Sequence, residues 1–293
     1  MVIITAYQIQ NASCRRVYRN MGIRYSCAVC FFGVIPRSIK HTWPQTFKNI
    51  ILPLREFCDV TIYVYNLDVG SAQVDGVVLD QNDCSIIPAD IRETSLQADV
   101  DKIISEKCKP ACQFRSDYNA VTTRNAMRQM HSEQHVAKFL RTSKHDLVVV
   151  AGPDYFFANK INLDHVSDSL SCRNCVYTSQ VNDAEGYTDG FYFGRREKVI
   201  CILDRFDDFV NSNHDYEYRV KQSFKKHGIT RKATDIVFWK IRANGRSHWQ
   251  GSQKLNYLEK NWLVRYIYIS NGWETNNKEA RRIRNLYRSS DYT

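Results

Sequence analysis

The sequence predicts a single α/β domain, in which helices flank a mostly parallel central sheet. Residues 147–150 form an apolar run, three of its four residues β-branched, that is typical of a strand buried on both faces. Residues 24–66 show strand, helix and strand patterns in turn, the order of a β-α-β unit. A length of 293 residues, with 43% hydrophobic residues but only 6 Pro and 12 Gly, allows one large core and no long low-complexity linker. We expect one domain over residues 1–293, with its core at 24–245 and a basic extension at 246–293.

The opening β-α-β unit contains the first candidate ligand loop. A strand is expected at 24–32, ending at Gly33, and the loop behind it carries Pro36 and Arg37. An apolar strand, a glycine and a loop with a basic residue are typical of the first strand of a nucleotide-binding α/β fold. The crossover to the next strand should be right-handed.

The rest of the chain alternates helical and strand patterns. Thr42 with Pro44 is typical of a helix start, because proline is tolerated in the first turn, and apolar residues then recur at helical spacing to Phe57. A strand with alternating apolar residues follows at 59–66. Beyond it we expect a short strand at 77–79, helices at 96–108, 120–141 and 161–171, strands at 176–179 and 191–193 (the latter closed by Gly194), helices at 195–209, 216–227 and 234–243, a strand at 263–269 and a helix at 274–288.

A single acid follows the central strand. Gly152 and Pro153 end the strand, because glycine frees the backbone and proline removes a ladder donor. Asp154 is thereby left at the carboxyl end, where open α/β sheets bind their ligands. It is the first candidate for chemistry, and the alternative is that it only caps a turn.

The helix expected at 120–141 carries a polar stripe. Arg124, Arg128, His131 and His135 follow one another at spacings of 4, 3 and 4 and fall within about 60° of one another around the helix. Such a stripe could meet a pyrophosphate or simply face solvent. Guanidinium groups suit bidentate phosphate contact, so Arg124 and Arg128 are the better phosphate-binding candidates.

The charge balance is basic, with 41 Lys and Arg against 31 Asp and Glu, a net charge of +10. The excess is concentrated at 221–232 and 278–288, where solvated helix faces are the simpler interpretation. No nucleic-acid-binding motif with interleaved aromatic residues is present, which argues against nucleic acid as the main partner. The basic surface could instead dock on an acidic acceptor or an anionic membrane surface.

Ten cysteines include two C-x-x-C pairs. Cys27 and Cys30 fall within the first strand, where alternation would send their sulfurs to opposite faces. Cys172 and Cys175 lack a neighbouring partner pair, so we expect free thiols in a reducing, cytoplasmic compartment rather than a zinc site. The first residues lack the features of a signal peptide, and no stretch approaches 18 apolar residues, so no membrane span is expected.

Three stretches, in this order, resemble GT-A-type sugar-nucleotide glycosyltransferases. Residues 30–38 resemble the opening strand of the family and its Phe-Gly loop ending in Arg. The long helix followed by 145–154 resembles its helix, strand and Arg-Pro-Asp element, and 187–194 resembles its Asp-x-Phe-x-x-Gly segment. The likeness covers about residues 24–245 and is greatest to poorly characterised transferases encoded by large DNA viruses and by some bacteria and algae.

The resemblance implies transfer of a sugar from a nucleotide-diphosphate donor to a hydroxyl on a glycan or glycoprotein, in the host cytoplasm if the source is viral. It implies that the donor is bound by Gly33, Pro36, Arg37, Arg124, Arg128 and Asp154. By position Asp154 would also hold Mn²⁺ or Mg²⁺ against the pyrophosphate. Because Ala151 to Pro153 stand where a second acid or an arginine is expected, the alternative is a metal-independent site in which arginines offset the pyrophosphate charge.

Asp189, just before the aromatic strand, is the candidate general base, and Asp235 could substitute for it. The alternative for Asp189 is a role in shaping its turn. The resemblance leaves open the sugar and the choice between retention and inversion. Two other functions remain: a nucleic-acid-binding or nucleotide-processing protein that uses its basic surface, and a catalytically inactive interaction module.

Overall fold

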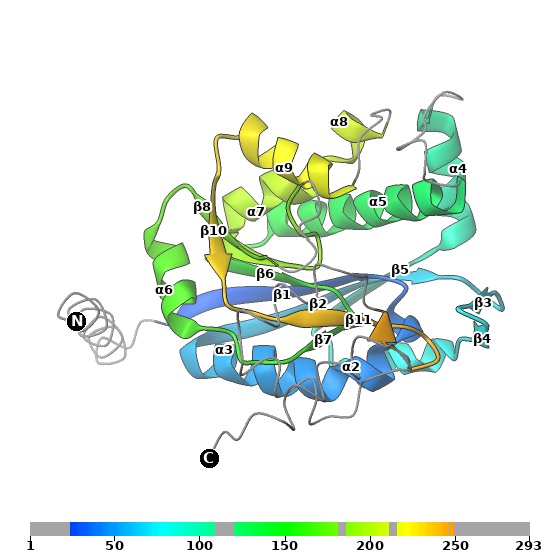
Figure 1. The fold of residues 1–293 in the computed structure, drawn as a ribbon, viewed down its shortest axis with the longest axis horizontal. Coiled ribbons are helices and arrows are strands. Elements are labelled where there is room, and N and C mark those ends of the chain that lie inside the picture. The colour runs from blue at the N-terminus through cyan, green and yellow to red at the C-terminus, as the bar shows by residue number, and fades with distance from the viewer. Residues whose placement is uncertain (1–23, 109–119, 181–185, 211–215, 246, 249–293) are drawn as a thin grey trace, which may run out of the picture.

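The computed structural model describes residues 24–108, 120–180, 186–210, 216–245 and 247–248. The chain folds as an α/β domain around a seven-stranded sheet with the strand order β10-β8-β9-β6-β1-β2-β5 (Figure 1). Of these seven strands only β9 runs antiparallel to its neighbours, so the predicted mostly parallel sheet is confirmed. The strands are β1 (Tyr25–Gly33), β2 (Cys58–Asp68), β5 (Ile91–Leu96), β6 (Leu147–Ala151), β8 (Cys175–Ser179), β9 (Phe191–Arg195) and β10 (Thr230–Thr234).

Helices cover both faces of the sheet, each over its own apolar core. Cys27 packs into one core and Cys30 into the other, which confirms that alternation separates the two sulfurs. The first face is covered by α2 (Ile39–Thr46), the π-helical turn η2 (Phe47–Ile51), α3 (Leu52–Phe57) and α6 (Leu163–Ser171). The second is covered by α4 (Gln97–Lys107), α5 (Ala120–Thr142), α7 (Arg196–Leu203), α8 (Phe206–Phe209) and α9 (Tyr216–Lys226).

A small antiparallel sheet follows Asp154. Its strands are β7 (Tyr155–Phe157), β11 (Phe238–Ile241) and β12 (Ser247–His248). The rings of Phe156 and Trp239 stack across it with centroids 5.1 Å apart. The remaining elements are the hairpin of β3 (Gln73–Val74) and β4 (Val77–Val78) and the short 3₁₀ helices η1 (Ile35–Arg37) and η3 (Gln81–Ile86).

The helix predicted at 234–243 is wrong. The segment contains the end of β10, a link and β11. Ile236, Val237, Phe238 and Trp239 are four consecutive buried residues, whereas four consecutive residues of a surface helix would include one that faces solvent. β-Branched and aromatic residues of this kind suit a strand, and β7 provides the partner.

Three smaller predictions also need correction. The first helix begins at Ile39 rather than at 42, so Pro44 lies inside it, and Thr42 donates to the Pro153 carbonyl (2.6 Å) instead of capping. Gly194 lies within β9 rather than closing it, and a Cβ there would approach Val176 Cγ2 to 3.0 Å. The helix expected at 195–209 is broken between α7 and α8, where Asp204 leaves helical geometry. The elements expected at 263–269 and 274–288 lie outside the described residues.

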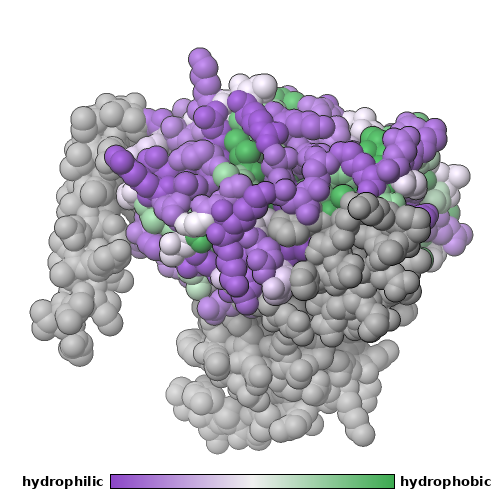
Figure 2. Space-filling model, turned by 90° about the horizontal axis from the view of Figure 1, so that it is seen from above, coloured by the Kyte–Doolittle hydropathy of each residue, from purple (hydrophilic) through white to green (hydrophobic). Residues whose placement is uncertain are grey.

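Figure 2 shows the side of the domain that carries the helices over the second core. Its coloured surface is largely hydrophilic, with scattered small apolar areas. Within the described ranges, no helix combines the length and the apolar character that crossing a bilayer requires.

Candidate active site

The loops that follow β1 and β6 meet at one edge of the sheet. The two strands are parallel neighbours, with Cys30 opposite Val150, so their carboxyl ends coincide. Gly33 turns the chain out of β1 at a φ of 103°, a conformation that favours glycine. The buried Asn66 side chain accepts a hydrogen bond from Ile35 N–H (3.1 Å) and holds the start of η1. η1, which begins with Ile35 and Pro36, then presents Arg37.

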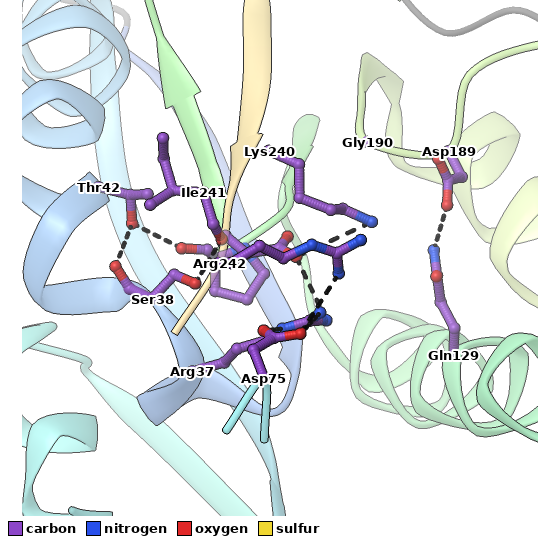
Figure 3. A network of polar contacts seen from close by, with 12 residues as sticks. Arg37, Ser38, Thr42, Asp75, Gln129, Asp189, Gly190, Lys240, Ile241 and Arg242 are labelled. Carbon is purple, nitrogen blue, oxygen red and sulfur yellow. Dashed lines mark hydrogen bonds and ion pairs between the residues drawn. The ribbon is translucent and has the colours of Figure 1, made fainter. Parts of the chain in front are cut away.

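Arg37 and Asp154 therefore lie side by side. Arg37 Nη1 is 3.6 Å from Asp154 Oδ2, and Lys240 Nζ is 3.9 Å from the same oxygen (Figure 3). Asp154 is largely buried, and its carbonyl accepts a hydrogen bond from Ile241 N–H (2.7 Å). The nearest charged partners of the Asp154 carboxylate are thus two cations from different parts of the chain.

A second carboxylate comes from the β3–β4 hairpin. Asp75 and Gly76 both have positive φ (51° and 77°), as a two-residue hairpin turn requires. Asp75 Oδ2 accepts hydrogen bonds from Arg37 Nε (3.1 Å) and from Ala243 N–H (3.2 Å), and Asp75 Oδ1 is 4.0 Å from Arg242 Nη1. Arg37 therefore bridges Asp75 and Asp154.

We call Arg37, Lys240 and Arg242 the basic cluster. Three cations against the carboxylates of Asp75 and Asp154 leave a net charge of +1. Burial disfavours the charged form of Arg37, but Asp154 and Asp75 outweigh burial and raise its pKa. Burial and the nearby Arg37 charge lower the pKa of Arg242. Burial would raise the pKa of Asp75, yet the hydrogen bond from Arg37 and its charge lower it.

Asp189 stands apart from the basic cluster (Figure 3) and precedes Gly190, which faces the ring of Tyr155. Gly152 N–H donates to the Gly190 carbonyl (3.0 Å), which fixes the start of β9 beside the end of β6. The Tyr155 ring fills the space left by these two glycines, because a Cβ on Gly190 would lie 2.6 Å from Tyr155 Cζ and one on Gly152 2.0 Å from Tyr155 Cδ2. Burial, followed by the charges of Asp189 and Asp154, raises the pKa of the Tyr155 hydroxyl.

Helix α5 supports Asp189 from behind. Gln129 Nε2 donates to Asp189 Oδ2 (2.6 Å), and no described residue hydrogen-bonds the other carboxylate oxygen. One turn further along α5, the fully buried Glu133 pairs with Arg205 (2.5 Å), which also donates to the Tyr216 hydroxyl. Burial raises the pKa of Glu133 to about 7 although Arg205 opposes the shift.

The predicted stripe on α5 does not reach Asp154. Arg128 makes two hydrogen bonds to Asp101 of α4, at 2.7 and 2.6 Å. His135 stacks on Tyr65 of β2 with centroids 4.4 Å apart. Arg124 is exposed, and no contact among the described residues joins Arg124 or Arg128 to the basic cluster.

Asp235 lies at the other end of the small sheet. It precedes β11, is half-exposed and has His165 Nδ1 3.7 Å from its Oδ1. Lys240 is five residues further along extended chain, which corresponds to roughly 17 Å at 3.3–3.4 Å per residue. The structure therefore does not bring Asp235 to Asp154.

Sequence reasoning missed Asp75, Gln129, Lys240 and Arg242. An Asp-Gly pair between Val74 and Val77 is a strong hairpin signal and would have placed Asp75 at a turn. The prediction of a helix at 234–243 gave no reason to place Lys240 and Arg242 at the site. No local signal points to Gln129, because its role depends on how α5 packs against β9.

The residues present do not suit a divalent cation. Among the described residues, no group of three or more His, Cys, Asp or Glu side chains is arranged to hold a metal ion.

Comparison with protein-family models and with curated proteins finds no match for this chain.

Proposed function

We propose that the protein is a GT-A-like glycosyltransferase that moves a sugar from a nucleoside-diphosphate donor to a hydroxyl on a glycan or glycoprotein. The observation that carries the proposal is the meeting of Arg37, Asp154 and Lys240 where the parallel strands β1 and β6 end. Ligands of open α/β sheets bind at this edge, and a group of cations there complements a diphosphate. The α/β architecture is compatible with the domain that the sequence resemblance implies.

In this proposal Asp189 is the general base. The acceptor oxygen attacks the anomeric carbon of the sugar, and the bond from that carbon to the diphosphate oxygen breaks. The hydroxyl proton passes to Asp189, while the bonding electron pair leaves with the nucleoside diphosphate. Asp189 suits this role because Gln129 orients one carboxylate oxygen and no described residue hydrogen-bonds the other. The basic cluster stabilises the charge that develops on the departing diphosphate.

A divalent metal takes no part in these steps. Mg²⁺ and Mn²⁺ prefer several oxygen ligands, but Asp154 faces Arg37 and Lys240 instead. The oxygens of Asp75 face Arg37, Arg242 and the Ala243 N–H. The Asp154 site therefore lacks the set of free acidic oxygens that a metal-assisted transferase would use.

The partners of the basic segment at 221–232 argue against nucleic acid binding. Lys226 pairs with Asp208 (2.5 Å) and Lys232 with Asp168 (2.6 Å). The Arg231 guanidinium lies over the Tyr187 ring, 4.4 Å from its centroid. These three cations are compensated or packed within the domain, which reduces the charge that they offer to a polyanion.

A thermal-shift panel tests the proposal. UDP-, GDP- and CMP-sugars are each added to the full chain, with an oligonucleotide in a parallel arm, because a specific ligand raises the melting temperature by mass action. We expect a shift with one class of nucleotide sugar and none with the oligonucleotide at physiological salt. A shift with the oligonucleotide alone would favour a nucleic-acid-binding protein instead.

A further inference from the structure

We propose that the basic cluster binds the diphosphate of the ligand directly and that this binding needs no divalent cation. The identity of the ligand as a nucleotide sugar rests on the proposed function, whereas the diphosphate contact does not. Three features of the cluster carry the inference: its charge, its unused hydrogen-bond donors and the rigidity of its support.

The charge of the site already favours an anion such as a diphosphate. Arg37, Lys240 and Arg242 outnumber the two neighbouring carboxylates, so the site is cationic before any metal is added. A divalent cation would raise a net charge of +1 to +3 beside three fixed cations, whereas a diphosphate is attracted to the site by its own negative charge. The side chains of Arg37, Lys240 and Arg242 are 24%, 29% and 26% exposed. Partial burial weakens solvent screening and so strengthens their attraction for an anion.

The cluster also holds unused donors. The ion pairs from Asp154 to Arg37 Nη1 (3.6 Å) and to Lys240 Nζ (3.9 Å) are longer than hydrogen bonds. Among the described residues, neither the Lys240 ammonium nor the Arg242 guanidinium donates a hydrogen bond. Lys240 lies in β11 and Arg242 directly follows the strand, two residues further along the chain, so alternation sends both side chains to the same side. Figure 3 shows their charged ends gathered with Arg37.

Short contacts fix the backbone that carries these cations. Ser38 Oγ donates to the Ile241 carbonyl (2.5 Å), and Thr42 Oγ1 donates to the Pro153 carbonyl (2.6 Å). Ile241 N–H in turn donates to the Asp154 carbonyl (2.7 Å). The start of α2 therefore ties β11 to the loop after β6, and the cluster is organised before a ligand arrives. In this arrangement Asp154 is the counter-ion that keeps Arg37 and Lys240 together, not a metal ligand.

Calorimetric titration of the full chain with inorganic pyrophosphate tests the inference. We expect binding in the presence of EDTA, with no more than a twofold gain on adding Mn²⁺. Lys240→Met and Arg242→Met should each weaken binding about tenfold, because each removes a charged donor. Lys232→Met is the matched control, since Lys232 lies on the preceding strand and is occupied by Asp168; its affinity should equal that of the wild type.

The Asp154→Asn variant distinguishes a counter-ion from a metal ligand, because the two roles predict different changes in pyrophosphate affinity. As a counter-ion, its loss makes the site more positive, so pyrophosphate should bind at least as tightly as to the wild type. As a metal ligand, its loss would abolish binding. Unchanged affinity in Lys240→Met and Arg242→Met, a strict need for Mn²⁺, or loss of binding in Asp154→Asn would overturn the inference.

The pyrophosphate titrations and the thermal-shift panel, each run in EDTA and with Mn²⁺, together separate this inference from the proposed function. Binding of a nucleotide sugar only with Mn²⁺ would overturn the metal-free site and leave the transferase proposal standing. Binding of pyrophosphate in EDTA, with no nucleotide sugar bound under any condition, would do the reverse. Absence of both would overturn both.

Discussion

The guanidinium of Arg37 lies 3.6 Å from the carboxylate of Asp154, although the two residues follow different strands. The contact results from the parallel pairing of β1 with β6, which brings the ends of both strands to one edge of the sheet. Because Arg37 also hydrogen-bonds Asp75, the pair is part of a charged site with net positive character. The four predictions below concern Asp189, the glycine that follows it, and two buried groups on helix α5.

Replacement by Asn should lower the transfer rate at Asp189 but not at Asp235. Asp189→Asn removes the proposed base, so the transfer rate should fall 10²-fold or more while donor affinity stays within twofold. Asp235→Asn should keep the wild-type rate, because Asp235 lies at the far end of β11. Steady-state kinetics with the donor identified in the thermal-shift panel provide the measurement. A rate loss in Asp235→Asn but not in Asp189→Asn would reverse the assignment.

Gly190 should tolerate no side chain while Tyr155 is present. A Cβ at this position would lie 2.6 Å from Tyr155 Cζ, so Gly190→Ala should destabilise the fold by about 1–3 kcal/mol through overpacking. Chemical denaturation of Gly190→Ala, Tyr155→Leu and the double variant forms a double-mutant cycle. The double variant should cost less than the sum of the single variants. Additive losses would show that the ring does not occupy this space.

The buried pair of Glu133 and Arg205 should show strong coupling. Arg205 stays charged when Glu133 is lost, so Glu133→Gln should cost about 3–5 kcal/mol. Arg205→Met should cost less, because burial already raises the pKa of Glu133 to about 7 and the unpaired carboxyl takes up a proton. The double variant should be more stable than the Glu133→Gln variant, because it leaves no buried charge. Urea denaturation monitored by circular dichroism measures all three. Equal or greater loss in the double variant would contradict the pairing.

His131 should make the fold less stable in mild acid. It is buried against Phe206, and burial followed by the nearby His135 and Lys138 lowers its pKa from 6.5 to about 4. Between these values the unfolded chain binds a proton that the folded chain does not. The contribution to stability is therefore lost as the pH falls from about 6.5 to about 4, by at most about 3 kcal/mol.

The measurement is the free energy of unfolding at pH 7 and pH 5 for the wild type and His131→Gln. The variant should lose less stability on acidification, whereas His227→Gln, which changes an exposed histidine, should behave as the wild type. Glu133 acts in the opposite direction, because burial raises its pKa to about 7, so the comparison with the variant isolates His131. Equal losses in the wild type and in His131→Gln would refute the assignment.

Patterns of the sequence predicted the frame of the fold but not every element. The run before Asp154 and the alternation at 59–66 are strong local signals, and both became strands. The segment at 234–243 has an apolar run too short to distinguish helix from strand by periodicity. Its conformation is set by pairing with β7, a partner distant in the sequence.

The candidate site, like the fold, was predictable only in part. Arg37 and Asp154 follow strands that could be recognised from the sequence, whereas the pairing of those strands became visible only in the structure. Asp75, Gln129 and Lys240 join the site through pairings with distant residues, which no local pattern contains. The stripe of Arg124 and Arg128 illustrates the converse, because helical spacing predicts which residues share a face but not which element covers that face.

The most direct test of the proposed transferase is the release of nucleoside diphosphate from the UDP- and GDP-sugars of the panel, measured in EDTA with wild type and with Asp189→Asn. With water or a simple sugar as acceptor, the wild type should release UDP or GDP from one donor, and Asp189→Asn should release it at least 10²-fold more slowly. Release at the same rate by both proteins, or no release from any donor with or without Mn²⁺, would contradict the proposal.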